Sequence, residues 1–177
     1  TFEDFADTSV LESLTKTISP EDDELVFNLY YKTRRIAKVI VPKSAIKDTT
    51  KPVNVTIKGI DPTASVIEEE NTQAYAYDIN VTNLKDNLKG DQLVTVIVAA
   101  PNALAAMNAY HNGKLIENAV YDEVEGTITF KTASFSPYDF TSKVVGVETL
   151  DELRKALSED GTTAKLIGEA TGLTIKK

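Results

Sequence analysis

The chain has 177 residues, 42% of them apolar, which allows one packed domain of ordinary size and a smaller appended segment. It contains no cysteine, which excludes disulfides, thiolate metal ligands and cysteine nucleophiles. That absence fits either a cytosolic protein or an exported protein of a bacterium that does not use disulfides. The 19 basic and 27 acidic residues give a net charge of −8, which disfavours nucleic acid as a partner.

Residues 1–23 form an acidic N-terminal segment. Ser9 and Glu12 have the spacing of a capping box, which predicts a short helix near residues 9–16. Ser19 and Pro20, followed by acidic residues, predict a solvated turn after it. A dense basic cluster comes shortly afterwards, flanked by strand-like residues: Lys32, Arg34, Arg35 and Lys38. This cluster alone does not outweigh the acidity of the whole chain.

Residues 24–143 carry the period-two alternation of half-buried β-strands. It is clear over residues 53–58 and again over residues 74–81, where Tyr75 and Tyr77 share a face with Ile79 and Val81 and are therefore expected to be buried. Residues 92–99 are apolar on both faces, which favours a central strand.

Turn signals separate these strands at even intervals. Asn112-Gly113 predicts a two-residue type I′ turn, between a strand ending near His111 and one starting near Lys114. Many short strands with such turns predict an all-β fold, an immunoglobulin-like antiparallel β-sandwich.

Residues 144–177 change to a helical period. Thr149 and Glu152 form another capping box, which predicts a helix from about residue 150 to 159, stopped by Gly161. Short strands are expected at residues 164–167 and 173–175, so this tail is a small α/β appendage. It is too short to bury a core of its own. It must therefore dock on the sandwich, pair with another chain or open a further domain. No apolar run is long enough to span a membrane, so no membrane insertion is expected in this segment.

Seven short pieces of the middle segment resemble, in the same order, the β-sandwich modules of large cell-surface proteins of gut Firmicutes and related bacteria. These modules are similar to the domain shared by zonula occludens proteins, netrin receptors and ankyrins. The pieces are residues 39–46, 53–57, 76–81, 94–98, 110–114, 126–130 and 133–138.

This resemblance implies a non-catalytic structural or adhesive module of an exported, wall-attached bacterial protein. Such a module has no catalytic, cofactor-binding or metal-binding residues. Its expected partners are a surface glycan or protein, of unknown identity, and neighbouring domains of the same polypeptide.

Residues 147–157, with the glycine and short strand after them, resemble the start of a right-handed parallel β-helix. In such proteins a helical cap shields the first coil of the solenoid. The resemblance implies that the natural protein continues as a β-helix beyond Lys177.

Some members of the wider family cleave themselves at a His-Phe-Ser step, and here the matching step is Phe135-Ser136. Ser134 stands at the histidine position, and a serine hydroxyl is a poor base near neutral pH. The favoured interpretation is therefore structural: Phe135 fills the core and Pro137 ends a strand at a sheet edge. A self-cleaving domain is the weakest of the functional hypotheses.

The other candidate groups also have plain interpretations. His111 is the only histidine and is expected to be an exposed turn residue. Two acidic runs lack the alternating spacing and glycine of a dedicated calcium loop, so both are expected to be solvated: Asp22, Asp23 and Glu24, and Glu68, Glu69 and Glu70.

There is no tryptophan, but tyrosines could form a sugar- or peptide-binding face. A carbohydrate- or peptide-binding domain with a tyrosine-lined face is therefore the alternative function. The tyrosines available are Tyr30, Tyr31, Tyr75, Tyr77, Tyr110, Tyr121 and Tyr138.

Overall fold

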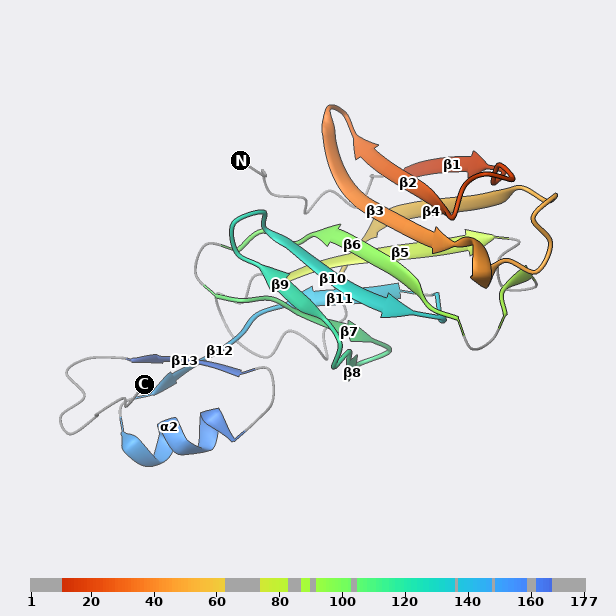
Figure 1. Cartoon of the computed structure of the whole chain (residues 1–177). Helices are drawn as coiled ribbons and strands as arrows, with labels where there is room; N and C mark the ends of the chain where they lie inside the picture. The colour runs from red at the N-terminus through yellow and green to blue at the C-terminus, as the bar shows by residue number, and fades with distance from the viewer. Residues whose placement is uncertain are drawn as a thin grey trace.

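The computed structural model describes residues 11–62, 74–82, 87–89, 92–102, 105–135, 137–147, 149–158 and 162–166. Two antiparallel sheets pack face to face, and a small unit of one helix and two strands follows them (Figure 1). The fold is thus the predicted all-β sandwich with a small helical appendage.

One layer is a six-stranded sheet. Its strands, in spatial order, are β1 (Leu11–Lys16), β4 (Val53–Ile60), β5 (Ala74–Thr82), β11 (Pro137–Thr141), β7 (Asn108–His111) and β8 (Lys114–Leu115). The other layer has five strands, in the order β2 (Glu24–Tyr31), β3 (Arg34–Pro42), β6 (Val94–Ala99), β10 (Thr127–Thr132) and β9 (Val120–Asp122). A 3-10 turn, η1 (Lys43–Ala45), follows β3.

The alternation in the sequence places the core between the sheets. In β4 every second side chain is buried, beginning with Val53, and Tyr75 and Tyr77 of β5 are buried as predicted. The strand expected to be central, β6, is the middle strand of its sheet. Aromatic rings fill the centre of the core, with the Phe130 ring centroid 5.1 Å from that of Tyr138 and 5.9 Å from that of Phe140.

Two of the hairpins have two-residue turns with a positive φ. Asn112 and Gly113 have φ angles of 51° and 75°, which confirms the predicted type I′ geometry between β7 and β8. In the β2–β3 hairpin the residue with a positive φ is Lys32, at 55°.

The prediction of a helix near residues 9–16 is wrong for residues 11–16, the part of that range that the structure describes. Residues 11–16 form β1, which pairs antiparallel with β4 along its whole length. The amide of Asn54 donates hydrogen bonds of 2.9 Å to the hydroxyls of both Ser13 and Thr15. These bonds and the ladder satisfy the edge of β4, which a helix would leave open. Residues 11–16 therefore belong to the sandwich rather than to a separate segment.

The prediction for Pro137 is also wrong. This residue begins β11 rather than ending a strand, and β11 lies inside its sheet between β5 and β7. The first position of a strand is one that a proline tolerates. Phe135 packs against the core, as expected.

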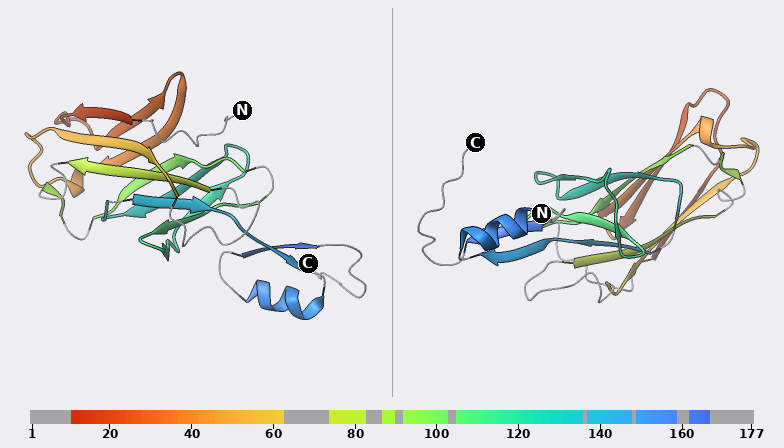
Figure 2. Two further views of the ribbon diagram at one scale, coloured as in Figure 1. Left: turned by 180° about the vertical axis from the view of Figure 1, so that it is seen from behind. Right: turned by 90° about the horizontal axis from the view of Figure 1, so that it is seen from below.

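The tail consists of β12 (Lys143–Val147), α2 (Leu150–Leu157) and β13 (Thr162–Leu166). The helix and its capping box on Thr149 and Glu152 confirm the prediction. β12 and β13 pair in parallel, and the pattern had not indicated β12. Gly161 and the strand expected at residues 173–175 lie outside the described residues. Figure 2 shows this unit beyond one end of the two layers.

β1 and β11 lie at different levels of the six-stranded sheet. Leu11, the first residue of β1, pairs with Lys58 near the end of β4, and Ile60 at that end pairs with Ala76 near the start of β5. In this register Leu11 is level with Asp78 and Pro137, whereas Thr141, the last residue of β11, pairs with Ala74, four residues away along β5. Ser142 alone separates β11 from β12.

Candidate functional site

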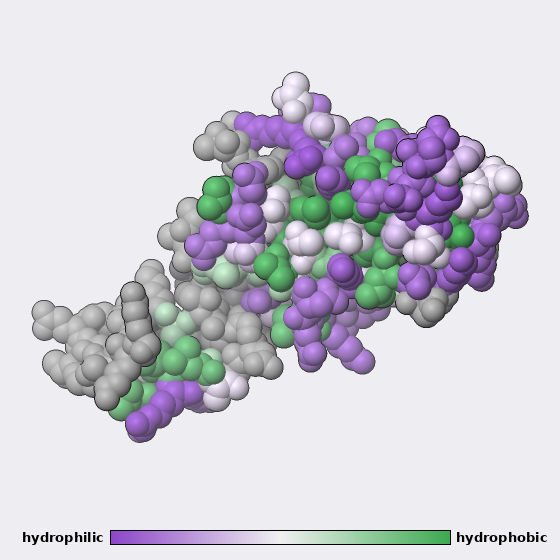
Figure 3. All heavy atoms as spheres, in the orientation of Figure 1, coloured by the Kyte–Doolittle hydropathy of each residue, from purple (hydrophilic) through white to green (hydrophobic). Residues whose placement is uncertain are grey.

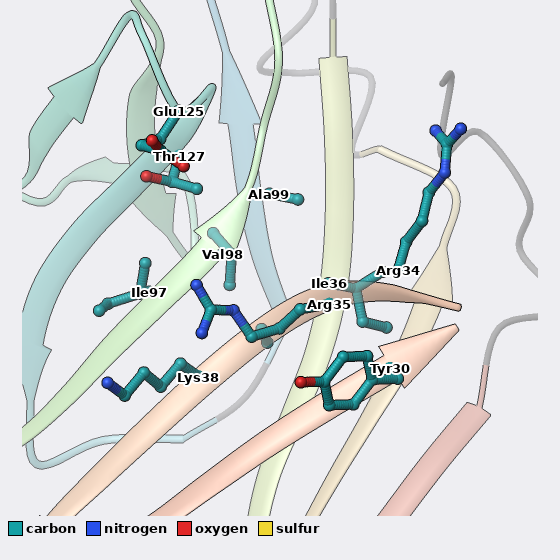
Figure 4. A pocket seen from close by; sticks show the side chains of 11 residues that line it. Tyr30, Arg34, Arg35, Ile36, Lys38, Ile97, Val98, Ala99, Glu125 and Thr127 are labelled. Carbon is teal, nitrogen blue, oxygen red and sulfur yellow. The ribbon is translucent and has the colours of Figure 1, made fainter. Parts of the chain in front are cut away.

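An open depression lies on the outer face of the five-stranded sheet, over the end of β2 and the start of β3. Its volume is about 480 Å³. We call it the basic depression, and the side chains that matter for its chemistry are Tyr30, Arg35, Lys38, Ile97, Glu125 and Thr127. Figure 4 shows them on β2, β3, β6, β10 and the turn before β10.

A bulge in β3 brings the two cations of the depression to one face. Leu29 pairs with Ala37 and Tyr30 with Arg35, so Ile36 has no partner in this register. In a regular strand, residues three apart point to opposite faces. The extra residue changes the alternation, and Arg35 and Lys38 extend in the same direction in Figure 4. The bulged Ile36 is buried.

Among the described residues, no acid neutralises the two cations. Arg35 Nη1 donates to Asn28 Oδ1 at 3.4 Å, and no described carboxylate forms an ion pair with either Arg35 or Lys38. Glu125 lies at the opposite rim. An open face thus holds two cations that are available to a ligand.

The structure divides the basic cluster seen in the sequence. Arg34 contributes to the rim, but its guanidinium points away from the Arg35 guanidinium and the Lys38 ammonium (Figure 4). Lys32 lies in the turn, with Nζ 5.2 Å from the centroid of the Tyr31 ring. The sequence therefore indicated the place, but not which two of the four side chains act together.

A second depression, of about 400 Å³, lies further along the same face and includes Ile40, Thr95 and Lys131. Lys38 pairs with Ile97 and Ile40 with Thr95, so β3 and β6 run continuously from one depression to the other. Figure 3 shows this face, where apolar side chains gather in the middle and polar ones surround them. The outer face therefore forms one strip with a basic end.

The tyrosines do not form a shared face. Tyr75, Tyr77 and Tyr138 are buried in the core, where burial raises the pKa of the Tyr77 and Tyr138 hydroxyls. The Tyr121 hydroxyl is bound, accepting a hydrogen bond of 2.9 Å from the backbone N–H of Asn102. Tyr30 is 45% exposed, and it is the tyrosine that lines the basic depression.

His111 is half-buried, so the expectation of an exposed turn residue is wrong. It is the last residue of β7 and pairs with Tyr138 of β11, with the ring centroids 4.9 Å apart. The loss of solvent lowers the pKa of the imidazole below its ordinary value. The Tyr138 hydroxyl donates to the Ser134 carbonyl. The strand pairing thus places the imidazole close to the segment that resembles a cleavage site; Ser136 itself lies outside the described residues.

The acidic runs assemble no metal site in the part of the chain that is described. Asp22, Asp23 and Glu24 are exposed, and no group of three or more metal-ligating side chains occurs among the described residues. Residues 68–70 lie outside them. Across the same described ranges, no helix combines the length and apolar character needed to cross a membrane.

No protein-family model matches this chain, and no curated protein matches it. The resemblance to bacterial surface modules therefore stays a proposal.

Proposed function

We propose that this chain is a non-catalytic structural and adhesive module of an exported bacterial surface protein. The observation that carries the proposal is the outer face of the five-stranded sheet. It presents two open depressions in line along β3 and β6, with two cations at one end that form no ion pair with a described carboxylate. The interior is filled by packed aliphatic and aromatic side chains, which suits a rigid support for such a face.

We also propose that this module precedes a parallel β-helix in the natural protein, and the tail supports this. β12 and β13 are parallel and are joined through α2, the connection that parallel strands need. Parallel strands are normally covered on both faces, and a sheet of two strands is marginally stable alone. A following solenoid would supply further strands of the same direction.

The test of export is the location of the protein in the cells that produce it. Antibody against this chain should label intact cells, and protease added outside the cells should remove the signal. The gene should encode an export signal before these residues and repeating coils after them. Detection of the protein in the cytosol alone, with intact cells unlabelled, would refute the proposal.

A further inference from the structure

We propose that the strip running from the basic depression along β3 and β6 binds an anionic glycan chain. Arg35 and Lys38 would pair with its carboxylate or phosphate groups, and the Tyr30 ring would pack against a sugar ring. This inference deepens the adhesive role proposed above and depends on it.

The charges give the first argument. The chain has a net charge of −8, yet Arg35 and Lys38 extend together over an open depression without a described acidic partner. A planar guanidinium can hold a carboxylate or phosphate through two parallel hydrogen bonds, while an ammonium acts as a point charge beside it. The acidity of the remaining surface would confine an anionic ligand to this place.

The neighbouring side chains favour a sugar over a simple ion. Tyr30 lies directly across from Arg35 in the β2–β3 pairing and is 45% exposed. Its ring offers an apolar surface beside the cation, with a hydroxyl at the far end. Thr127 and the Glu125 carboxylate lie across the depression and can accept hydrogen bonds from sugar hydroxyls.

The length of the strip favours a polymer. Pro42 in the second depression lies seven positions after Arg35 in the basic depression, which corresponds to about 23 Å at the rise of an extended strand. The distant end holds one further cation, Lys131, together with the exposed Glu24 carboxylate. An extended chain with spaced charges could contact both depressions, whereas a single sugar could reach only one.

The test is calorimetric titration of the complete 177-residue chain with defined polymers. Oligogalacturonate supplies carboxylates, a phosphomannan supplies phosphates attached to sugar rings, and fully methyl-esterified oligogalacturonate is the neutral control. We expect at least one of the anionic polymers to bind and the neutral one not to bind. Preference between the two anionic polymers identifies which anion the strip selects. Binding should also weaken as salt is raised.

The variants locate the site. R35Q and K38Q should each reduce affinity by about tenfold, the size expected for the loss of one charge-assisted contact. Tyr30→Ala should weaken binding, whereas Tyr30→Phe should largely preserve it because the ring face is retained. Lys58→Gln removes the same charge from an exposed position on the other sheet and should leave affinity unchanged.

Three results would overturn the inference. These are no binding of either anionic polymer, equal losses in the Lys58→Gln and Arg35→Gln proteins, and equally tight binding of a single-stranded oligonucleotide, which would indicate general anion exchange. Labelling of intact cells tests export separately, so a protein that is displayed on cells but binds neither polymer refutes this inference and leaves the proposed export intact.

Discussion

Single residues in the turns show where the backbone of this protein is strained. Asn112 and Gly113 suit their left-handed conformations, since asparagine tolerates a positive φ and glycine has no Cβ to clash. Lys32 adopts φ of 55° with a full side chain, a conformation that costs an L-residue about 1–2 kcal/mol. The β2–β3 hairpin thus forms despite an unfavourable residue in its turn.

We expect Lys32→Gly to raise the free energy of unfolding by about 1 kcal/mol, because glycine relieves the left-handed strain at some cost in chain entropy. Urea denaturation measures the change. Lys32→Ala is the matched control, since it removes the contact with Tyr31 but keeps a Cβ and should bring no gain. Equal effects of glycine and alanine would show that φ is not the cause.

His111 gives the fold a dependence on pH. Its pKa in the folded protein is lowered from the ordinary value of 6.5 by desolvation. Between the folded and unfolded pKa values the unfolded chain binds more protons, so this contribution to stability is fully present above about pH 6.5 and is lost as pH falls from there through the lower pKa of the folded protein. His111→Gln should therefore lose less stability than the parent between pH 7 and pH 5 in urea titrations. A larger loss of stability in His111→Gln than in the parent would show that His111 is not the source of the pH dependence.

At the scale of the elements, Lys16 helps to close an edge of the sandwich. It is the last residue of β1, and its ammonium donates to the Val26 carbonyl of edge strand β2 while lying 5.6 Å from the Phe27 ring centroid. An open carbonyl on a long edge strand is a place where another chain can pair. Lys16 therefore stabilises the fold and protects that edge.

Lys16→Met keeps the length of the side chain but removes its donor and charge. We expect the free energy of unfolding to fall by about 0.5–1 kcal/mol. We also expect self-association to increase at high protein concentration. Analytical ultracentrifugation measures the second effect, with Lys58→Met as the control for loss of charge alone. An unchanged monomer in both variants would show that Lys16 does not protect the edge.

The helix of the tail depends on its N-cap. The Thr149 hydroxyl accepts from the backbone N–H of Glu152, and the Glu152 side chain accepts from that of Thr149. Thr149→Ala should destabilise α2 by about 1 kcal/mol. Amide hydrogen exchange should then quicken in α2 and stay unchanged in the sandwich, and Thr149→Ser should preserve protection. Exchange that is unchanged in Thr149→Ala would contradict a role for the cap.

The elements also show how far a sequence pattern can be trusted. Alternation predicted β4 and β5 because burial between two sheets imposes a period of two, whereas β6 was predicted from an apolar run over residues 92–99. It did not predict β1, because the local capping signal competes with pairing to β4, which is distant in sequence. The bulge at Ile36 was equally hidden, since a change of register appears only when the strands are paired. The basic cluster could be seen, but the alignment of Arg35 with Lys38 could not.

At the scale of the whole molecule, the intact chain is the test of self-cleavage. The fold places His111 beside Tyr138, a proximity that their separation in sequence does not reveal. We still expect mass spectrometry to give one species of 19.3 kDa, because Ser134 occupies the position of the base. Fragments split between Phe135 and Ser136 that disappear in Ser136→Ala would establish cleavage.

The levels of β1 and β11 in the six-stranded sheet have a mechanical consequence. Leu11 is level with Pro137 at the start of β11, and the two strands run from that level in opposite directions, so Leu11 lies about 13 Å along the sheet from the level of Thr141. A pull applied between Leu11 and Thr141 would pass through the β1–β4, β4–β5 and β5–β11 ladders, all of which belong to the six-stranded sheet. The outer face of the five-stranded sheet would lie outside that path.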